Sequence, residues 1–164
     1  MSEVFLAAQI ASLAVKIEEQ GVIFYNALVR STDDKPAREL FTLLSKQENR
    51  HASFFKALIK SERENPNLAV YSGEFYYYVL AILTSLKNFL FDDNGSIILP
   101  LDFSRALDTG IDIEKKSIEA YTNIYNTLDK RYTNVLLDII DEEKRHLKSL
   151  LALRKKNFPE DEKK

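Results

Sequence analysis

The chain contains two histidines, and each follows a glutamate by three residues within a segment patterned for helix. The pairs are Glu48 with His51 and Glu143 with His146. Positions i and i+3 lie on one face of an α-helix, so each pair can direct a carboxylate oxygen and an imidazole nitrogen towards one point. Such a donor set suits iron, manganese or zinc. The two motifs therefore predict helices that contribute ligands to a metal site.

Apolar residues recur at steps of three and four and predict four long helices, at 2–29, 36–62, 102–128 and a last one that carries 136–153. Only four glycines and four prolines interrupt the chain, which favours long helices. Pro36 follows two aspartates and is typical of a helix start. The connections are short, long and short, so we expect an all-α fold of two antiparallel helical hairpins joined by one crossover.

The long crossover spans residues 65–102 and is not polar. Its segment 74–91 is rich in Phe, Tyr, Leu and Ile and predicts one short helix, followed by a turn at 92–95. We interpret this segment as a lid over the bundle, with a dimer surface or a membrane-facing patch as alternatives. The bundle is expected to occupy residues 1–155, and 156–164 form a polar C-terminal tail.

The two halves of the chain repeat one arrangement, in which a helix with a single glutamate in its apolar stripe precedes the helix with Glu-x-x-His. Glu18 precedes Glu48 by 30 residues, and Glu114 precedes Glu143 by 29. A glutamate inside an apolar stripe is unexpected, because a buried lone carboxylate costs several kcal/mol. The repetition therefore predicts that both extra glutamates belong to the same site.

Four buried carboxylates at one level need cations to balance their charge. Two divalent ions would neutralise their charge. Four carboxylates and two imidazoles can also fill most of the roughly twelve coordination positions of two six-coordinate metals. About two positions remain for water, oxygen or peroxide. We predict no catalytic residue beyond the ligands themselves. The predicted metal ligands are Glu18, Glu48, His51, Glu114, Glu143 and His146.

Two tyrosines occupy corresponding positions in the halves, each seven residues after the single glutamate. Tyr25 and Tyr121 can hydrogen-bond the glutamates of the opposite half and so orient the ligands. They can equally be core aromatics with a satisfied hydroxyl group. Asp138 and Asp141 flank the last motif but lie off its apolar stripe, so we expect them in solvent or around the ligands rather than on the metal.

At these six positions, and in the order of its connections, the chain resembles the rubrerythrin branch of the ferritin-like di-iron carboxylate superfamily. The resemblance implies a ferritin-like four-helix bundle with two iron ions, or manganese or zinc in their place. It further implies an oxidoreductase that reacts with hydrogen peroxide or dioxygen under oxidative stress, using electrons from a separate rubredoxin or reductase.

Two departures weaken the narrower peroxidase assignment. Rubrerythrin peroxidases carry a further glutamate about one turn after the first on the third helix, where this chain has Ser117 and Ile118. Glu119 lies a step too far round the helix to replace it. The chain also contains no cysteine, so the four-cysteine rubredoxin-like domain of many rubrerythrins is missing. Two alternatives stay open: a ferroxidase-type iron-handling protein, and a non-catalytic metal-binding or interaction module.

Composition excludes several other classes of protein. The lack of cysteine excludes disulfides, zinc–thiolate sites and iron–sulfur clusters, and it suits a reducing cytoplasm. A net charge of −2 without a basic stripe argues against nucleic-acid partners. The sequence offers no signal peptide and no apolar run long enough to cross a membrane. We expect a cytoplasmic homodimer.

Overall fold

Five helices make up most of the described structure, a computed structural model that covers residues 4–64, 70–94, 96–98, 102–127 and 130–159. Four of them are long and correspond to the predicted bundle, and the fifth lies in the crossover. They are α1 (Ala7–Ser31), α2 (Lys35–Glu64), α3 (Gly73–Leu90), α4 (Phe103–Thr127) and α5 (Lys130–Asn157).

Side-chain caps fix where three of the helices begin. Asp34 accepts a hydrogen bond from the backbone N–H of Ala37 at 2.7 Å, which starts α2 beside Pro36 as predicted. Asp102 and Ser72 cap α4 and α3 in the same way. Each cap satisfies an amide that the first helical turn leaves without a partner.

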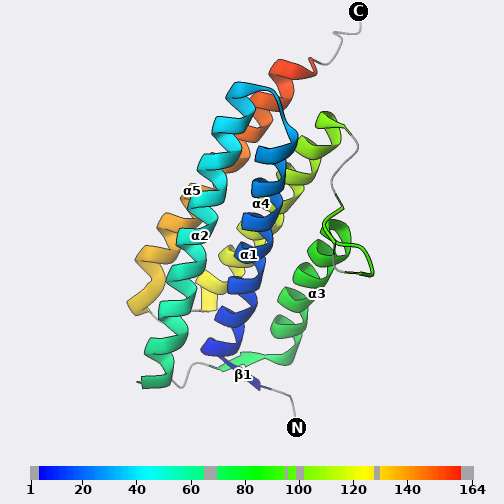
Figure 1. Cartoon of the computed structure of the whole chain (residues 1–164). Helices are drawn as coiled ribbons and strands as arrows, with labels where there is room; N and C mark the ends of the chain where they lie inside the picture. The colour runs from blue at the N-terminus through cyan, green and yellow to red at the C-terminus, as the bar shows by residue number, and fades with distance from the viewer. Residues whose placement is uncertain (1–3, 65–69, 95, 99–101, 128–129, 160–164) are drawn as a thin grey trace, which may run out of the picture.

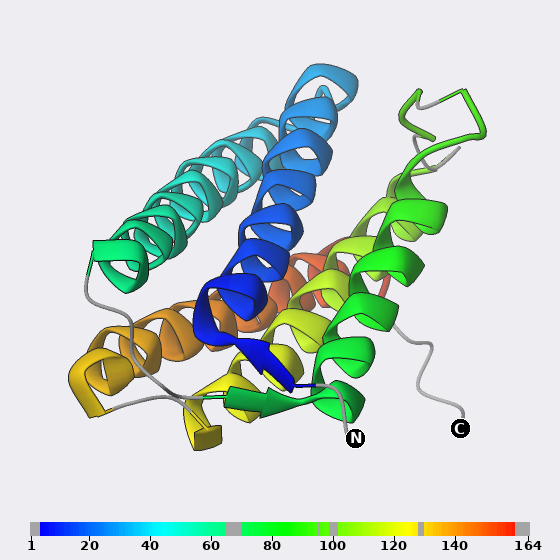
Figure 2. The same cartoon turned by 90° about the horizontal axis from the view of Figure 1, so that it is seen from below.

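The helices form two hairpins that face each other, α1 with α2 and α4 with α5 (Figure 1). Across the bundle α1 contacts α4, and α2 contacts α5. The view from below shows α3 outside this group of four, along α1 and α4 (Figure 2). The predicted all-α, ferritin-like four-helix bundle with a helix in its crossover is confirmed.

Large apolar and aromatic side chains fill the space between the hairpins. Phe24, Phe41 and Leu136 are fully buried, and each such side chain stabilises the fold by roughly 1.5–3 kcal/mol relative to an exposed one. α3 buries Val79, together with Ile82, against the bundle. α3 therefore covers one side of the bundle, along α1 and α4.

The prediction that the first helix begins at residue 2 is wrong. Residues Val4–Leu6 form a short strand, β1, that pairs antiparallel with β2 (Val70–Ser72). The apolar pattern of α1 continues back into these residues, and periodicity cannot reveal a partner more than 60 residues away. The pairing ties the start of α1 to the start of α3 at one end of the bundle (Figure 2).

The last helix continues further than expected. α5 ends at Asn157, beyond the predicted end of the bundle at residue 155, and Phe158 N–H still bonds to the carbonyl of Arg154 at 2.9 Å. Residues 160–164 of the expected tail lie outside the described residues. Among the helices that the structure describes, none combines the length and apolar character needed to cross a membrane.

Candidate metal centre

The bundle brings all six predicted ligands together in its interior. α1 and α4 supply one glutamate each, and α2 and α5 supply the two Glu-x-x-His pairs. The exposed fractions are between 0% and 4%, for Glu18, Glu48, His51, Glu114, Glu143 and His146. Because the repeated spacing places each residue on the inward face of its helix, the two hairpins contribute equivalent sets of donors.

The six side chains form two overlapping groups. Glu18 and His51 belong to one, and Glu114 and His146 belong to the other. Within each group one ligand atom per residue lies within 4.8 Å of every other. Glu48 and Glu143 complete both groups, so these two carboxylates lie between two potential metal positions.

Several of these atoms are buried without a hydrogen-bond partner, which supports the fit of a metal. The Nδ1 atom of each histidine and both oxygens of Glu143 are in this state. His51 Nδ1 lies 2.9 Å from Glu143 Oε1 and His146 Nδ1 lies 3.0 Å from Glu143 Oε2, but the angles are not those of hydrogen bonds. Buried polar atoms are normally bonded, so converging unbonded donors of this kind fit divalent cations.

Each tyrosine bonds the glutamate of the opposite hairpin. The Tyr25 hydroxyl donates to Glu114 Oε1, and the Tyr121 hydroxyl donates to Glu18 Oε1. Both tyrosines are fully buried. Of the two predicted roles, the structure therefore shows hydrogen bonds to ligands, which leave the second oxygen of each carboxylate for the centre.

Two contacts to the histidines were not predicted. His51 Nε2 lies 2.9 Å from Glu142 Oε2, and His146 Nε2 lies 3.1 Å from Gln47 Oε1. Glu142 is also bonded by the guanidinium of Arg50. The sequence does carry a signal: Gln47 and Glu142 each precede the motif glutamate by one residue, so the repeat extends one position further than Glu-x-x-His.

Burial and mutual contact shift the pKa values of several predicted ligands. Burial and the charge of Glu48 raise the pKa of Glu18 and of Glu114 well above the usual range of a carboxyl group. Burial alone would lower the pKa of His146, but its contacts with Glu114 and Glu143 raise it to about 12. Protons thus offset the charge that divalent ions would neutralise.

The Rubrerythrin family model matches residues 10–90. The chain is rubrerythrin-like. This match includes most of α1 and the whole of α2 and α3, and with them Glu18, Glu48 and His51. The predicted ligands of the second hairpin lie outside the matched residues. Their assignment depends on the internal repeat and on the geometry described above. No curated protein and no solved structure gives a significant match to the chain.

In this rubrerythrin-like bundle, α4 carries no carboxylate at the position one turn after Glu114, where rubrerythrin peroxidases have a further glutamate. Ser117 is buried there, one turn after Glu114. Glu119 is exposed and accepts a hydrogen bond from Tyr78 of α3, so it faces away from the centre as expected. Asp138 and Asp141 are exposed too, and Asp141 pairs with Lys144 at 3.2 Å. None of these four residues belongs to the two donor groups.

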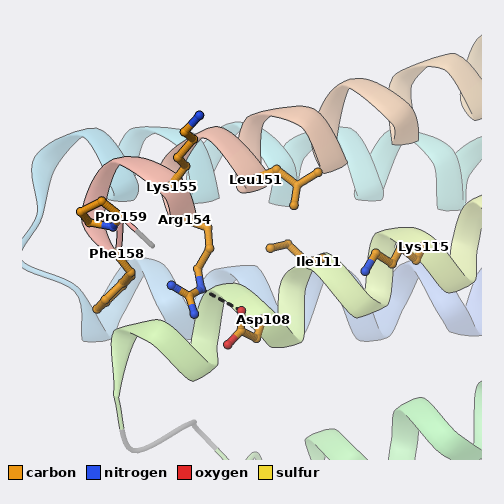
Figure 3. A pocket seen from close by; sticks show the side chains of 8 residues that line it. All are labelled: Asp108, Ile111, Lys115, Leu151, Arg154, Lys155, Phe158 and Pro159. Atoms are coloured by element: carbon orange, nitrogen blue, oxygen red, sulfur yellow. Dashed lines mark hydrogen bonds and ion pairs between the residues drawn. The ribbon is translucent and has the colours of Figure 1, made fainter. Parts of the chain in front are cut away.

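A separate hollow of about 940 Å³ lies between α4 and α5 (Figure 3). Arg154 crosses it to bond Asp108 at 2.8 Å, and its guanidinium lies 4.8 Å from the ring centre of Phe158. No candidate ligand lines the hollow. It therefore belongs to the outer surface of the second hairpin rather than to the metal centre.

Proposed function

We propose that this chain is a non-haem di-iron oxidoreductase that reduces hydrogen peroxide or dioxygen with electrons from a separate donor protein. The observation that supports the proposal is the pair of donor groups sharing Glu48 and Glu143. Bound iron would supply the electrons and open coordination positions that the oxidant needs. Reduction of peroxide then consumes two electrons and two protons and yields two molecules of water.

The side chains of the chain have three tasks in such a reaction. The carboxylates balance the charge of the ions, and the buried core around them excludes bulk water. Tyr25 holds one oxygen of Glu114 and Tyr121 holds one oxygen of Glu18, so that the other oxygen of each carboxylate is directed towards the centre. Burial raises the pKa of both hydroxyls well above 10, which keeps them hydrogen-bond donors at neutral pH.

Electrons must reach the centre from outside the chain. The sequence has no cysteine and hence no iron–sulfur cluster of its own. A rubredoxin-type protein or a reductase in a reducing cytoplasm fits this requirement. We expect such a donor to re-reduce the oxidised protein through repeated cycles.

An anaerobic titration with ferrous iron tests the proposal. We expect saturation at two irons per chain, loss of at least one of them in Glu48→Gln, and no change in Asp138→Asn, an exposed carboxylate variant on α5. The iron-loaded protein is then mixed with peroxide or with dioxygen in a stopped-flow instrument. No saturable iron binding, or no oxidation by either reagent, would refute the proposed activity.

One observation favours a second candidate, a ferroxidase-type iron-handling protein. The buried side chain one turn after Glu114 is Ser117 rather than a carboxylate, so the ligand typical of rubrerythrin peroxidases is missing. In this case oxidised iron would leave the centre after one turnover. Retention of two irons through several cycles of peroxide and donor would exclude it, and release of ferric iron would support it.

A further inference from the structure

The primary donors of the two potential metal positions correspond one to one. Each position has its own glutamate and its own histidine, and the two positions share Glu48 and Glu143. Each separate glutamate also accepts one tyrosine hydroxyl from the opposite hairpin. If nothing else differed, the two positions would bind a divalent ion equally well.

The outer nitrogens of the histidines break this correspondence. His51 Nε2 contacts the carboxylate of Glu142 at 2.9 Å, whereas His146 Nε2 contacts the side-chain amide of Gln47 at 3.1 Å. The two partners occupy equivalent places in the repeat, one residue before each motif glutamate. They have nearly the same size, but only one of them is charged.

Charge and chemistry give the two partners different effects. A carboxylate only accepts, so Glu142 keeps the hydrogen of His51 on Nε2 and leaves Nδ1 as the ligand atom. An amide can present either its oxygen or its nitrogen after a 180° rotation, so Gln47 fixes His146 less strictly. A hydrogen bond to a charged acceptor is also the stronger one and makes the imidazole a better metal donor.

Two arginines also contact the Glu142 carboxylate and affect its charge and its position. Arg50 from α2 bonds its Oε2, and Arg145 lies 3.7 Å from its Oε1. Their positive charges partly offset the negative charge of the carboxylate. They also hold it in place against the ring, because Glu142 is hydrogen-bonded by Arg50 from the facing helix and paired with Arg145 on its own helix.

We propose that Glu142 is a positioning residue that makes the metal position at His51 the tighter of the two, so that the positions fill in a fixed order. The inference rests on the proposed metal centre but not on its reaction with peroxide or dioxygen. Removal of such an outer partner typically costs roughly 10- to 100-fold in metal affinity. We therefore expect the two positions to differ by about tenfold.

Another difference between the halves does not produce this order. Gly21 and Ser117 each follow the separate glutamate of their half by three residues. A Cβ atom at Gly21 would lie 3.2 Å from Glu48 Cγ, so Gly21 lies next to a carboxylate that both positions share. Its effect therefore falls on both positions together.

The two histidines make a direct test possible. Protein labelled with ¹⁵N only in histidine is titrated with zinc, which is diamagnetic and redox-inert, while NMR follows the two rings; His51→Gln and His146→Gln assign the signals. In the natural protein we expect the metal-free signal of His51 to lose most of its intensity by the first equivalent, and that of His146 to lose most of its intensity only with the second. In Glu142→Gln the two should disappear together.

Exchange of the two partners provides the matched control. The double variant Q47E/E142Q keeps the composition of the site and moves the carboxylate to His146, so the order should reverse. Simultaneous loss of both signals in the natural protein, or an unchanged order in either Glu142→Gln or the double variant, would overturn the inference, as would absence of zinc binding. Failure to react with peroxide or dioxygen would leave it intact and refute only the proposed activity.

Discussion

The hydroxyl group of Tyr25 on α1 donates a hydrogen bond to the carboxylate of Glu114 on α4, 89 residues away in the sequence. The equivalent bond runs from Tyr121 to Glu18. Each bond occupies Oε1 and leaves Oε2 towards the centre; Glu18 Oε2 has no hydrogen-bond partner. The same two hydroxyl groups therefore join the hairpins and orient two of the predicted ligands.

Removal of one of these hydroxyls should destabilise the protein. In Tyr25→Phe the Glu114 carboxylate loses its donor within the core, and an unsatisfied buried acceptor costs about 1–3 kcal/mol. Urea unfolding of the metal-free protein measures this loss. Tyr125→Phe, a half-buried tyrosine on the helix of Tyr121, should change the free energy of unfolding by less than about 0.5 kcal/mol. Equal effects of the two variants would contradict the proposed role.

A methyl group at Gly21 should weaken metal binding without unfolding the bundle. It would lie 3.2 Å from Glu48 Cγ, so the ligand must move by a few tenths of an ångström. Gly21→Ala should therefore bind zinc more weakly, although alanine favours the helix by up to about 1 kcal/mol. Gly110→Ala is the control, since its methyl meets Leu150 Cδ1 at 3.3 Å. Zinc affinity that falls equally in both variants would argue against a specific effect on Glu48.

Metal binding should release protons and weaken as the pH falls. Burial and neighbouring charge raise the pKa of Glu18 and Glu114, so both carboxyl groups of the metal-free site hold their protons to a higher pH than ordinary carboxyl groups. An incoming cation must displace them, and a lower pH strengthens that competition. Calorimetric titrations with zinc in two buffers of different ionisation enthalpy give the number of protons released. Glu18→Gln should release fewer, and a pH-independent affinity would contradict the prediction.

The contact between α3 and α4 should weaken in alkali. Burial, together with the hydrogen bond to Glu119 and its charge, raises the pKa of Tyr78 to about 12. A pKa above the unfolded value of 10 means that the contribution to stability is fully present below pH 10 and is lost as the pH rises through 12. The difference in unfolding free energy between the natural protein and Tyr78→Phe should shrink from pH 8 to pH 11.5. A constant difference would show that this bond does not stabilise the fold.

Periodicity predicts most of the bundle because its elements follow local rules. The Glu-x-x-His spacing places His51 and His146 on the same helical faces as their glutamates, and the repeat adds Glu18 and Glu114. Spacing along one helix says nothing about the register between helices, however. Glu142 and Gln47 reach histidines on the facing helix, so their contacts depend on how α2 and α5 are aligned.

The strand pair could not be predicted for a related reason. Val4–Leu6 continues the apolar pattern of the first helix, and three residues are too few to show the alternation of a strand. What selects the extended form is the partner, Val70–Ser72, which follows the first hairpin in the sequence. Sequence periodicity reports local preference, whereas this element exists through a long-range pairing.

The bonds of the tyrosines and histidines across the bundle have a consequence for how such a chain could arise. A single hairpin carries one glutamate, one Glu-x-x-His pair and one tyrosine, but each of its outer contacts is made by the other hairpin. One hairpin is half of a centre, and two identical copies side by side would make a whole one. The present chain has the form of such a pair fused by the crossover. In a single chain the two halves can differ, and Gln47 opposite Glu142 is a difference that two identical subunits could not have.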